Sequence, residues 1–73
     1  MVTVKTKAIK HLMIDKGFKS QVQLAQAAGI HKDRVNKILN GKDRGLTLAT
    51  INKFCRALEC QPGEILEYIP DSE

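Results

Sequence analysis

Residues 20–41 read SQVQLAQAAGIHKDRVNKILNG, and this stretch decides the fold. Ser20 followed by Gln23 three positions later is a capping box, a start signal for a helix. Gly29 supplies the left-handed residue that ends such a helix. We therefore expect a helix of only about eight residues here, bounded by Ser20 and Gly29. Its inward face is predicted to consist of Leu24, Ala25 and Ala28.

A second short helix is expected directly after the three residues Gly29-Ile30-His31. It covers about residues 32–40, and Gly41 ends it. This connection has the length that a helix-turn-helix uses, and a small residue at Ala25 lets the two helices cross closely. The residues predicted to turn inward are Val35, Ile38 and Leu39, with Ile30 filling the junction.

The opposite face of this second helix is polar. At about 100° per residue, burial of Val35 and Ile38 turns the polar side chains away from the core. Arg and Lys can donate to guanine, Asn can pair with adenine, and a carboxylate can accept from cytosine, so these groups suit the major groove of DNA. A solvated helix face is the simpler alternative. The outward residues are Asp33, Asn36, Lys37 and Asn40, with Lys32 and Arg34 flanking them.

Three further helices are expected from the apolar spacing. The first covers about residues 5–16 and ends at Gly17. Another is capped by Thr47, and the last begins at Gln61 with Pro62 in its first position. The predicted core face of the helix after Thr47 is Leu48, Ile51, Phe54, Cys55 and Leu58. The last helix is predicted to contribute Ile65, Leu66, Tyr68 and Ile69.

At the N-terminus, Val2 and Val4 alternate with polar residues, which is typical of a short strand. Such a strand would pair with Tyr68 and Ile69 near the other end. The predicted fold class is all-α, a compact domain of five helices with this short β-strand as an addition. Residues 1–73 are expected to form one domain, because a chain this short supports one modest core.

The composition argues against an enzyme. The chain shows no nucleophile with a base, no carboxylate pair with a reason to be buried and no phosphate-binding loop, so no catalytic residue is expected.

Cys55 and Cys60 are predicted to be reduced and buried. Because His11 and His31 are distant from them in sequence, no metal or cofactor site is expected. No apolar run is long enough for a membrane span or a secretory signal, so we expect a cytoplasmic protein without a membrane partner.

Charge is divided unevenly along the chain. Residues 1–44 carry ten Lys or Arg and three acidic residues, a net charge of +7. Residues 45–73 carry two Lys or Arg and five acidic residues, a net charge of −3. A basic part beside an acidic part suggests a polyanion on one side of the molecule. Chance asymmetry of a solvated surface is the alternative. Single-stranded RNA is disfavoured, because one Tyr, two Phe and no Trp offer little for base stacking.

Several short motifs occur together over residues 6–69, and with them the chain resembles the lambda-repressor-like, Cro-type helix-turn-helix family, also called XRE. The resemblance is to its small single-domain bacterial and phage branch. It implies a five-helix DNA-binding domain of a transcriptional regulator, usually a repressor and usually a dimer. The motifs are Ser20-Gln21, Leu24-Ala25, Gly29-Ile30, Val35, Ile38, Asn40-Gly41-Lys42, Thr47-Leu48 and Ala57-Leu58.

The resemblance also implies which residues touch DNA. Base contacts fall on Lys32, Asp33, Arg34 and Lys37, with Asn36 as a weaker candidate. Phosphate contacts fall on Ser20, Gln21, Asn40, Lys42 and Arg44. Two residues depart from the family pattern. His31 stands where a Ser or Thr cap is common, so the start of this helix is either less well held or sensitive to pH. Asp33 either pairs with Lys37 or reads a cytosine.

The expected partners are double-stranded DNA and a second copy of the chain, and no small-molecule ligand is evident. One module of this size buries little DNA surface, and a dimer on two half-sites is the usual solution. The candidate interface is the acidic C-terminal part with Tyr68, Ile69, Val2 and Val4. The alternative function is a protein-binding adaptor or antitoxin-like partner that uses the acidic half.

Overall fold

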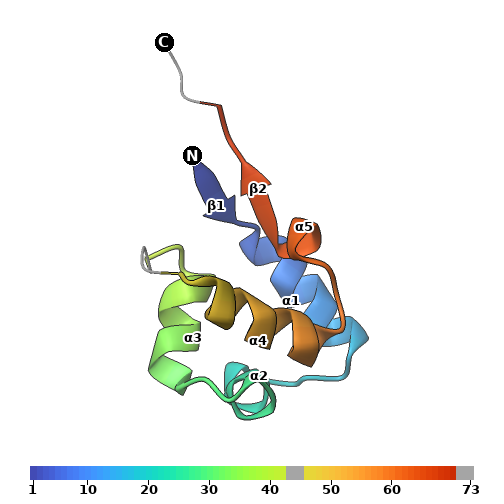
Figure 1. Cartoon of the computed structure of the whole chain (residues 1–73). Helices are drawn as coiled ribbons and strands as arrows, with labels where there is room; N and C mark the ends of the chain where they lie inside the picture. The colour runs from blue at the N-terminus through green and yellow to red at the C-terminus, as the bar shows by residue number, and fades with distance from the viewer. Residues whose placement is uncertain (43–45, 71–73) are drawn as a thin grey trace.

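The computed structural model describes residues 1–42 and 46–70. Five helices form a small body, and a two-stranded antiparallel ribbon projects from it beside both chain ends (Figure 1). This architecture confirms the predicted fold class, including the short strand. The elements are β1 (Val2–Val4), α1 (Thr6–Asp15), α2 (Gln21–Ala28), α3 (Lys32–Leu39), α4 (Leu48–Leu58), α5 (Pro62–Ile65) and β2 (Leu66–Tyr68).

The core lies where the helices meet, and every helix contributes to it. Apolar side chains at helical spacing become almost completely buried, which confirms the inward faces predicted for α2 and α3. Phe54 of α4 is the largest of the fully buried side chains. The residues of this cluster include Ile9, Met13, Leu24, Ala25, Val35, Ile38, Leu39, Phe54, Leu58 and Ile65.

The prediction for Leu48 is wrong. This side chain is 84% exposed, although it was expected on the core face of α4. At about 100° per residue, Leu48 lies about 120° around the helix from Phe54, so it cannot share that face. Thr50 takes the buried position one turn before Phe54, where its hydroxyl lies 3.2 Å from the hydroxyl of Thr47.

The last helix is shorter than expected, and its continuation is a strand. Helix α5 begins at Pro62 as predicted, and the N–H of Gln61 donates to the carboxylate of Glu64 over 2.7 Å. The predicted contribution of Leu66, Tyr68 and Ile69 to this helix is wrong, because the chain becomes extended after Ile65 and pairs with β1. The pairing gives Ile69 a backbone partner that an isolated last turn would lack.

The predicted pairing of the two chain ends is confirmed, with a defined register. Val2 lies opposite Tyr68 and Val4 lies opposite Leu66. The N–H of Ile69 donates to the carbonyl of Met1 over 2.7 Å, which extends the pairing beyond the strands.

The two cysteines are free thiols and only half-buried, so the prediction that they are buried holds in part. Burial and the neighbouring Cys55 thiol raise the pKa of Cys60 to about 11, which keeps that thiol protonated at neutral pH. Over residues 1–42 and 46–70, no three His, Cys, Asp or Glu side chains gather as a metal site would require. In the same part of the chain, no helix has the length and apolar character to cross a membrane.

Candidate nucleic-acid interface

Helices α2 and α3 meet through a tight turn. Gly29 adopts φ 73°, and the N–H groups of Gly29 and Ile30 both donate to the carbonyl of Ala25, over 2.9 and 3.0 Å. A left-handed residue at this position favours glycine, which explains why α2 ends there. Ala25 itself is buried, so the small residue lies where the two helices approach. The arrangement is a helix-turn-helix.

A contact from α4 supports the end of α2. The guanidinium of Arg56 lies 3.5 Å from the carbonyl of Ala28 and donates to it. The last carbonyls of a helix lack partners within the helix, and a cation there also interacts favourably with the helix dipole. The sequence does not predict this contact, because nothing in the spacing of residues 28 and 56 indicates that they meet.

Helix α3 has one buried and one exposed face. Val35, Ile38 and Leu39 are buried against the core, as predicted. The residues predicted to point outward are exposed, and Arg34 is half-buried at the boundary. The exposed set comprises Lys32, Asp33, Asn36, Lys37 and Asn40. The structure therefore brings the candidate base-reading side chains together on one surface.

Two asparagines one turn apart on this face are linked. The amide nitrogen of Asn40 donates to the amide oxygen of Asn36 over 2.8 Å. The spacing of four residues is the signal that could have predicted the bond. The bond leaves the amide NH₂ of Asn36 free to donate and the amide oxygen of Asn40 free to accept. The same surface therefore offers one donor group and one acceptor to other partners.

His31 caps α3 through its ring. Its Nδ1 accepts a hydrogen bond from the N–H of Asp33 over 3.2 Å, and the same nitrogen lies 3.7 Å from the Asp33 carboxylate. The ring can accept that bond only while Nδ1 is unprotonated. The carboxylate of Asp33 thus lies beside His31, and the alternative of a pair with Lys37 is wrong for the described residues.

The start of α2 offers backbone donors. Ser20 Oγ accepts from the N–H of Gln23 over 3.3 Å, as the predicted cap requires, but the side chain of Gln23 accepts from Lys19 instead of Ser20. The capping box is therefore realised in one of its two bonds. In the described structure, the N–H groups of Gln21 and Val22 have no protein partner. Free N–H groups at a helix start suit an anion such as phosphate.

The end of α3 carries the other candidate phosphate contacts. Asn40 and Lys42 are exposed, and the N–H of Lys42 donates to the carbonyl of Lys37 over 2.8 Å across Gly41. This backbone bond holds Lys42 close to the last turn of α3. Arg44, which was also predicted to contact phosphate, lies outside the described residues.

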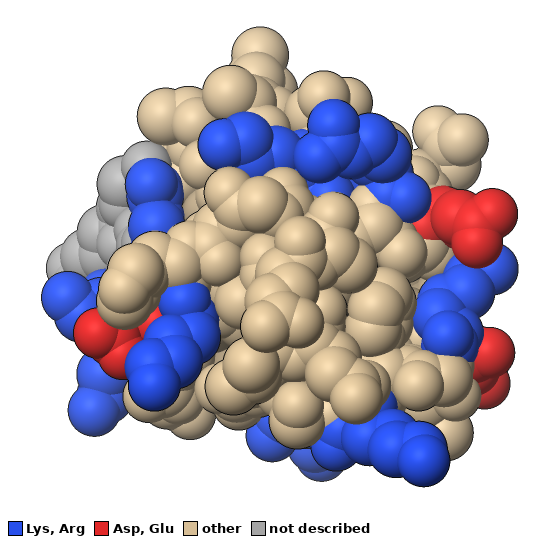
Figure 2. Space-filling view, turned by 90° about the horizontal axis from the view of Figure 1, so that it is seen from below, with Lys and Arg blue, Asp and Glu red and all other residues tan. Residues whose placement is uncertain are grey.

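Figure 2 views the molecule from the side of α2. Lys and Arg side chains gather around the rim of this face, including the edge at which α3 lies, with fewer Asp and Glu side chains between them, and the centre is uncharged. The uncharged centre agrees with α2 itself, whose sequence QVQLAQAA contains no ionisable residue. A neutral helix with an excess of cations around it can approach a polyanion with little net repulsion.

Comparisons with known proteins agree with this geometry. A model of the Cro/C1-type HTH DNA-binding domain matches residues 8–71. A relative from Bacillus subtilis (strain 168), the uncharacterized HTH-type transcriptional regulator YozG, is 39% identical over 62 residues, which cover 85% of this chain and 74% of the relative. No solved structure gives a significant match. This family comprises DNA-binding transcription regulators and is not a class of enzymes. The chain belongs to the Cro/C1-type helix-turn-helix family of DNA-binding domains.

Proposed function

We propose that the protein is a sequence-specific regulator that binds double-stranded DNA as a dimer, with α3 in the major groove, and represses transcription by occupying its site. The observation that supports this most is the exposed face of α3. It carries Lys32, Asp33, Asn36 and Lys37 on a helix whose opposite face is buried and whose start is fixed by the turn after α2. Such a helix presents base-reading groups in a defined orientation.

In this proposal α2 and α3 make different kinds of contact with DNA. The side chains from Lys32 to Lys37 that reach the surface of α3, including the half-buried Arg34, contact base edges. The start of α2, with Ser20, Gln21 and the free N–H groups, binds one phosphate, and the end of α3 binds another. Asn40, Lys42 and Arg44 would supply that second group of contacts. Phosphate contacts fix the register, whereas the α3 side chains choose the sequence.

The test is selection from a random pool of DNA duplexes, followed by titration of the winner and of a scrambled duplex at several salt concentrations. We expect a two-fold symmetric winner that is bound at least about 1,000-fold more tightly than the scramble. Its log affinity should fall linearly with log salt, by about 0.9 per phosphate contacted. If no sequence is enriched and binding vanishes near physiological salt, the basic surface is only a charge patch and the adaptor alternative gains support.

Asp33→Asn is expected to relax the choice of base at one position of each half-site. A carboxylate accepts from the amino group of cytosine and repels the acceptor groups of other bases. Its removal should raise affinity for scrambled DNA severalfold and lower discrimination at that position by roughly tenfold, which corresponds to about 1.4 kcal/mol. The measurement is a titration of operators that differ at single positions.

The matched control for this change is Asp15→Asn, which removes the same charge from the exposed end of α1. We expect it to change affinity for all duplexes alike and to leave discrimination intact. Equal discrimination by both variants and the unchanged protein would show that Asp33 only repels DNA and reads no base.

A further inference from the structure

The last turn of α4 brings two cysteine side chains together. The N–H groups of Glu59 and Cys60 both donate to the carbonyl of Cys55, the second over 3.1 Å. In this type of helix end, the residue beyond the left-handed turn contacts the side chain one turn inside the helix. The thiol of Cys60 is accordingly hydrogen-bonded to the thiol of Cys55. Two sulfur atoms that lie this close can form a covalent bond after a small rotation of the side chains.

This turn also contacts two other helices. Glu59 has φ 52°, and among the described residues it alone combines a positive φ with a side chain. The Glu59 carboxylate lies 3.5 Å from the ammonium of Lys16, the residue that follows α1. Arg56, the neighbour of Cys55, donates to the carbonyl of Ala28 at the end of α2. A change in this turn therefore acts on the part of α4 that supports the helix-turn-helix.

The surroundings give the Cys60 thiol its own chemistry. Burial and the neighbouring Cys55 raise the pKa of Cys60 to about 11, and the carboxylate of Glu64 adds to this shift. Cys60 is therefore a protonated thiol at neutral pH. The charge and the hydrogen bond of Cys55 raise this pKa only while its sulfur is free. Once another group is bonded to Cys55, the pKa of Cys60 falls, and the nearby ammonium of Lys16 favours the Cys60 thiolate.

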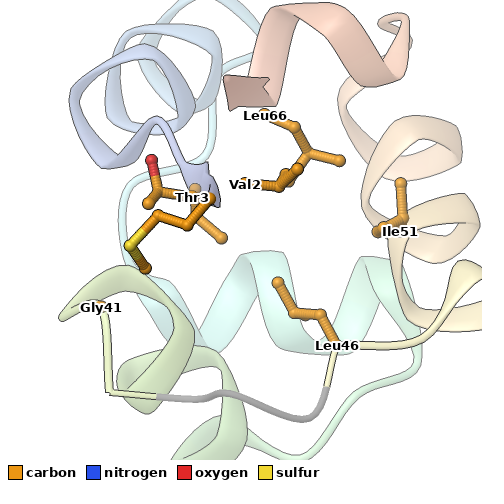
Figure 3. A pocket seen from close by; sticks show the side chains of 8 residues that line it. Val2, Thr3, Gly41, Leu46, Ile51 and Leu66 are labelled. Carbon is orange, nitrogen blue, oxygen red and sulfur yellow. The ribbon is translucent and has the colours of Figure 1, made fainter. Parts of the chain in front are cut away.

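The apolar hollow beneath the ribbon of β1 and β2 is a separate feature. Figure 3 shows that Leu46 and Ile51 face Leu66 across it. In the described structure, neither cysteine lines this hollow. A reagent therefore reaches the half-buried thiols from the surface, where the end of α4 meets α5 and the end of α1.

We propose that Cys55 and Cys60 are a redox-modification site, which a low-molecular-weight disulfide converts reversibly into an intramolecular disulfide. The Cys55 thiolate makes the first attack, because Cys60 stays protonated. This step forms a mixed disulfide on Cys55 and releases one thiolate of the reagent. Cys60 then loses its proton to solvent and attacks the Cys55 sulfur, which releases the second reagent thiolate. The chain gives up two electrons and two protons, and the reagent disulfide is reduced to two thiols.

The cross-link is expected to stabilise the fold. A disulfide acts mainly by restricting the unfolded chain, and even the short loop between Cys55 and Cys60 contributes. We expect the oxidised chain to melt about 5–15 °C above the reduced chain. Because the two thiols are held side by side, ring closure should outrun release of the mixed disulfide, which therefore does not accumulate. This chemistry does not depend on whether the chain binds DNA.

The experiment is incubation of the full chain with oxidised glutathione as the probe, followed by acid quenching, alkylation of free thiols and mass spectrometry. We expect a monomeric product that has lost two hydrogen atoms, takes up no alkylating reagent and returns to the dithiol with dithiothreitol. The melting temperature of this product, measured by circular dichroism, should show the predicted rise. A chain that stays reduced, stops at the mixed disulfide or becomes linked to a second copy would overturn the proposal.

Two matched variants test the order of attack. Cys60→Ser should stop at the mixed disulfide on Cys55, because no resolving thiol remains. Cys55→Ser should react with glutathione disulfide at least about tenfold more slowly than Cys60→Ser, because burial still keeps the Cys60 thiol protonated. Peptide mapping of the first mixed disulfide in the unchanged chain gives the same assignment without any substitution. Glutathione found first on Cys60, or equal rates for the two variants, would contradict the assigned roles.

Discussion

Lys37→Glu is expected to reduce affinity for the selected operator by at least about 100-fold, the largest effect of any single exposed side chain in this protein. Lys37 lies in the last turn of α3 on its exposed face, beside Asn36 and one turn after Asp33. Loss of a good base contact costs about 1–3 kcal/mol, and the new carboxylate adds repulsion by the phosphates. The proposed dimer carries the change twice.

Graded variants separate these contributions. Lys37→Gln removes the cation without adding an anion, so a loss of about tenfold is expected, with a shallower dependence on salt. Lys53→Glu makes the same change of two charges on the exposed surface of α4, outside the candidate interface, and serves as the control. Equal losses at Lys37 and Lys53 would show that DNA senses only the net charge of the protein. Glutamate near a helix end opposes the helix dipole, so the melting temperature of each variant must be measured as well.

The helix-turn-helix could be predicted from the sequence because local signals fix it. Ser20 as a cap, Gly29 as a left-handed stop and the inward spacing of Val35 and Ile38 depend on neighbours within one or two turns. Such signals act whatever the rest of the chain does. They also determine which face of α3 is exposed, and hence which side chains are available to DNA.

The features that the sequence predicted wrongly or left open depend on contacts between distant residues or on side-chain geometry. Leu48 lies three residues before Ile51, which fits an apolar helical spacing. Only its angular position around the helix relative to Phe54 shows that it lies outside the core. The extended conformation after Ile65 follows from pairing with β1, some sixty residues earlier in the chain. Asp33 has a lysine at helical spacing, yet its carboxylate lies beside the histidine that caps its own helix. Charge spacing alone does not indicate that His31 lies beside this carboxylate.

Phe54→Ala is expected to destabilise the protein by about 3–5 kcal/mol, because truncation leaves a cavity in a close-packed core. Phe54 is 2% exposed and is the largest of the fully buried side chains. A domain of this size has a total stability of roughly 4–11 kcal/mol, so much of the variant should be unfolded at physiological temperature. The expected fall in melting temperature is about 15–30 °C, measured by circular dichroism. Phe18→Ala is the control, because Phe18 is only half-buried and its loss should cost less.

The same variant tests whether DNA binding depends on the fold as a whole. Phe54 lies on α4, which packs against α2 but presents no side chain among the candidate DNA contacts. Its truncation should therefore weaken apparent affinity only through the unfolded fraction. Excess operator at about 100 times its Kd should restore about 2.7 kcal/mol of stability and return the helical signal, because DNA binds the folded form alone. If saturating operator leaves the variant unfolded, or if the refolded variant has lost discrimination between sequences, then Phe54 also positions α3 against DNA.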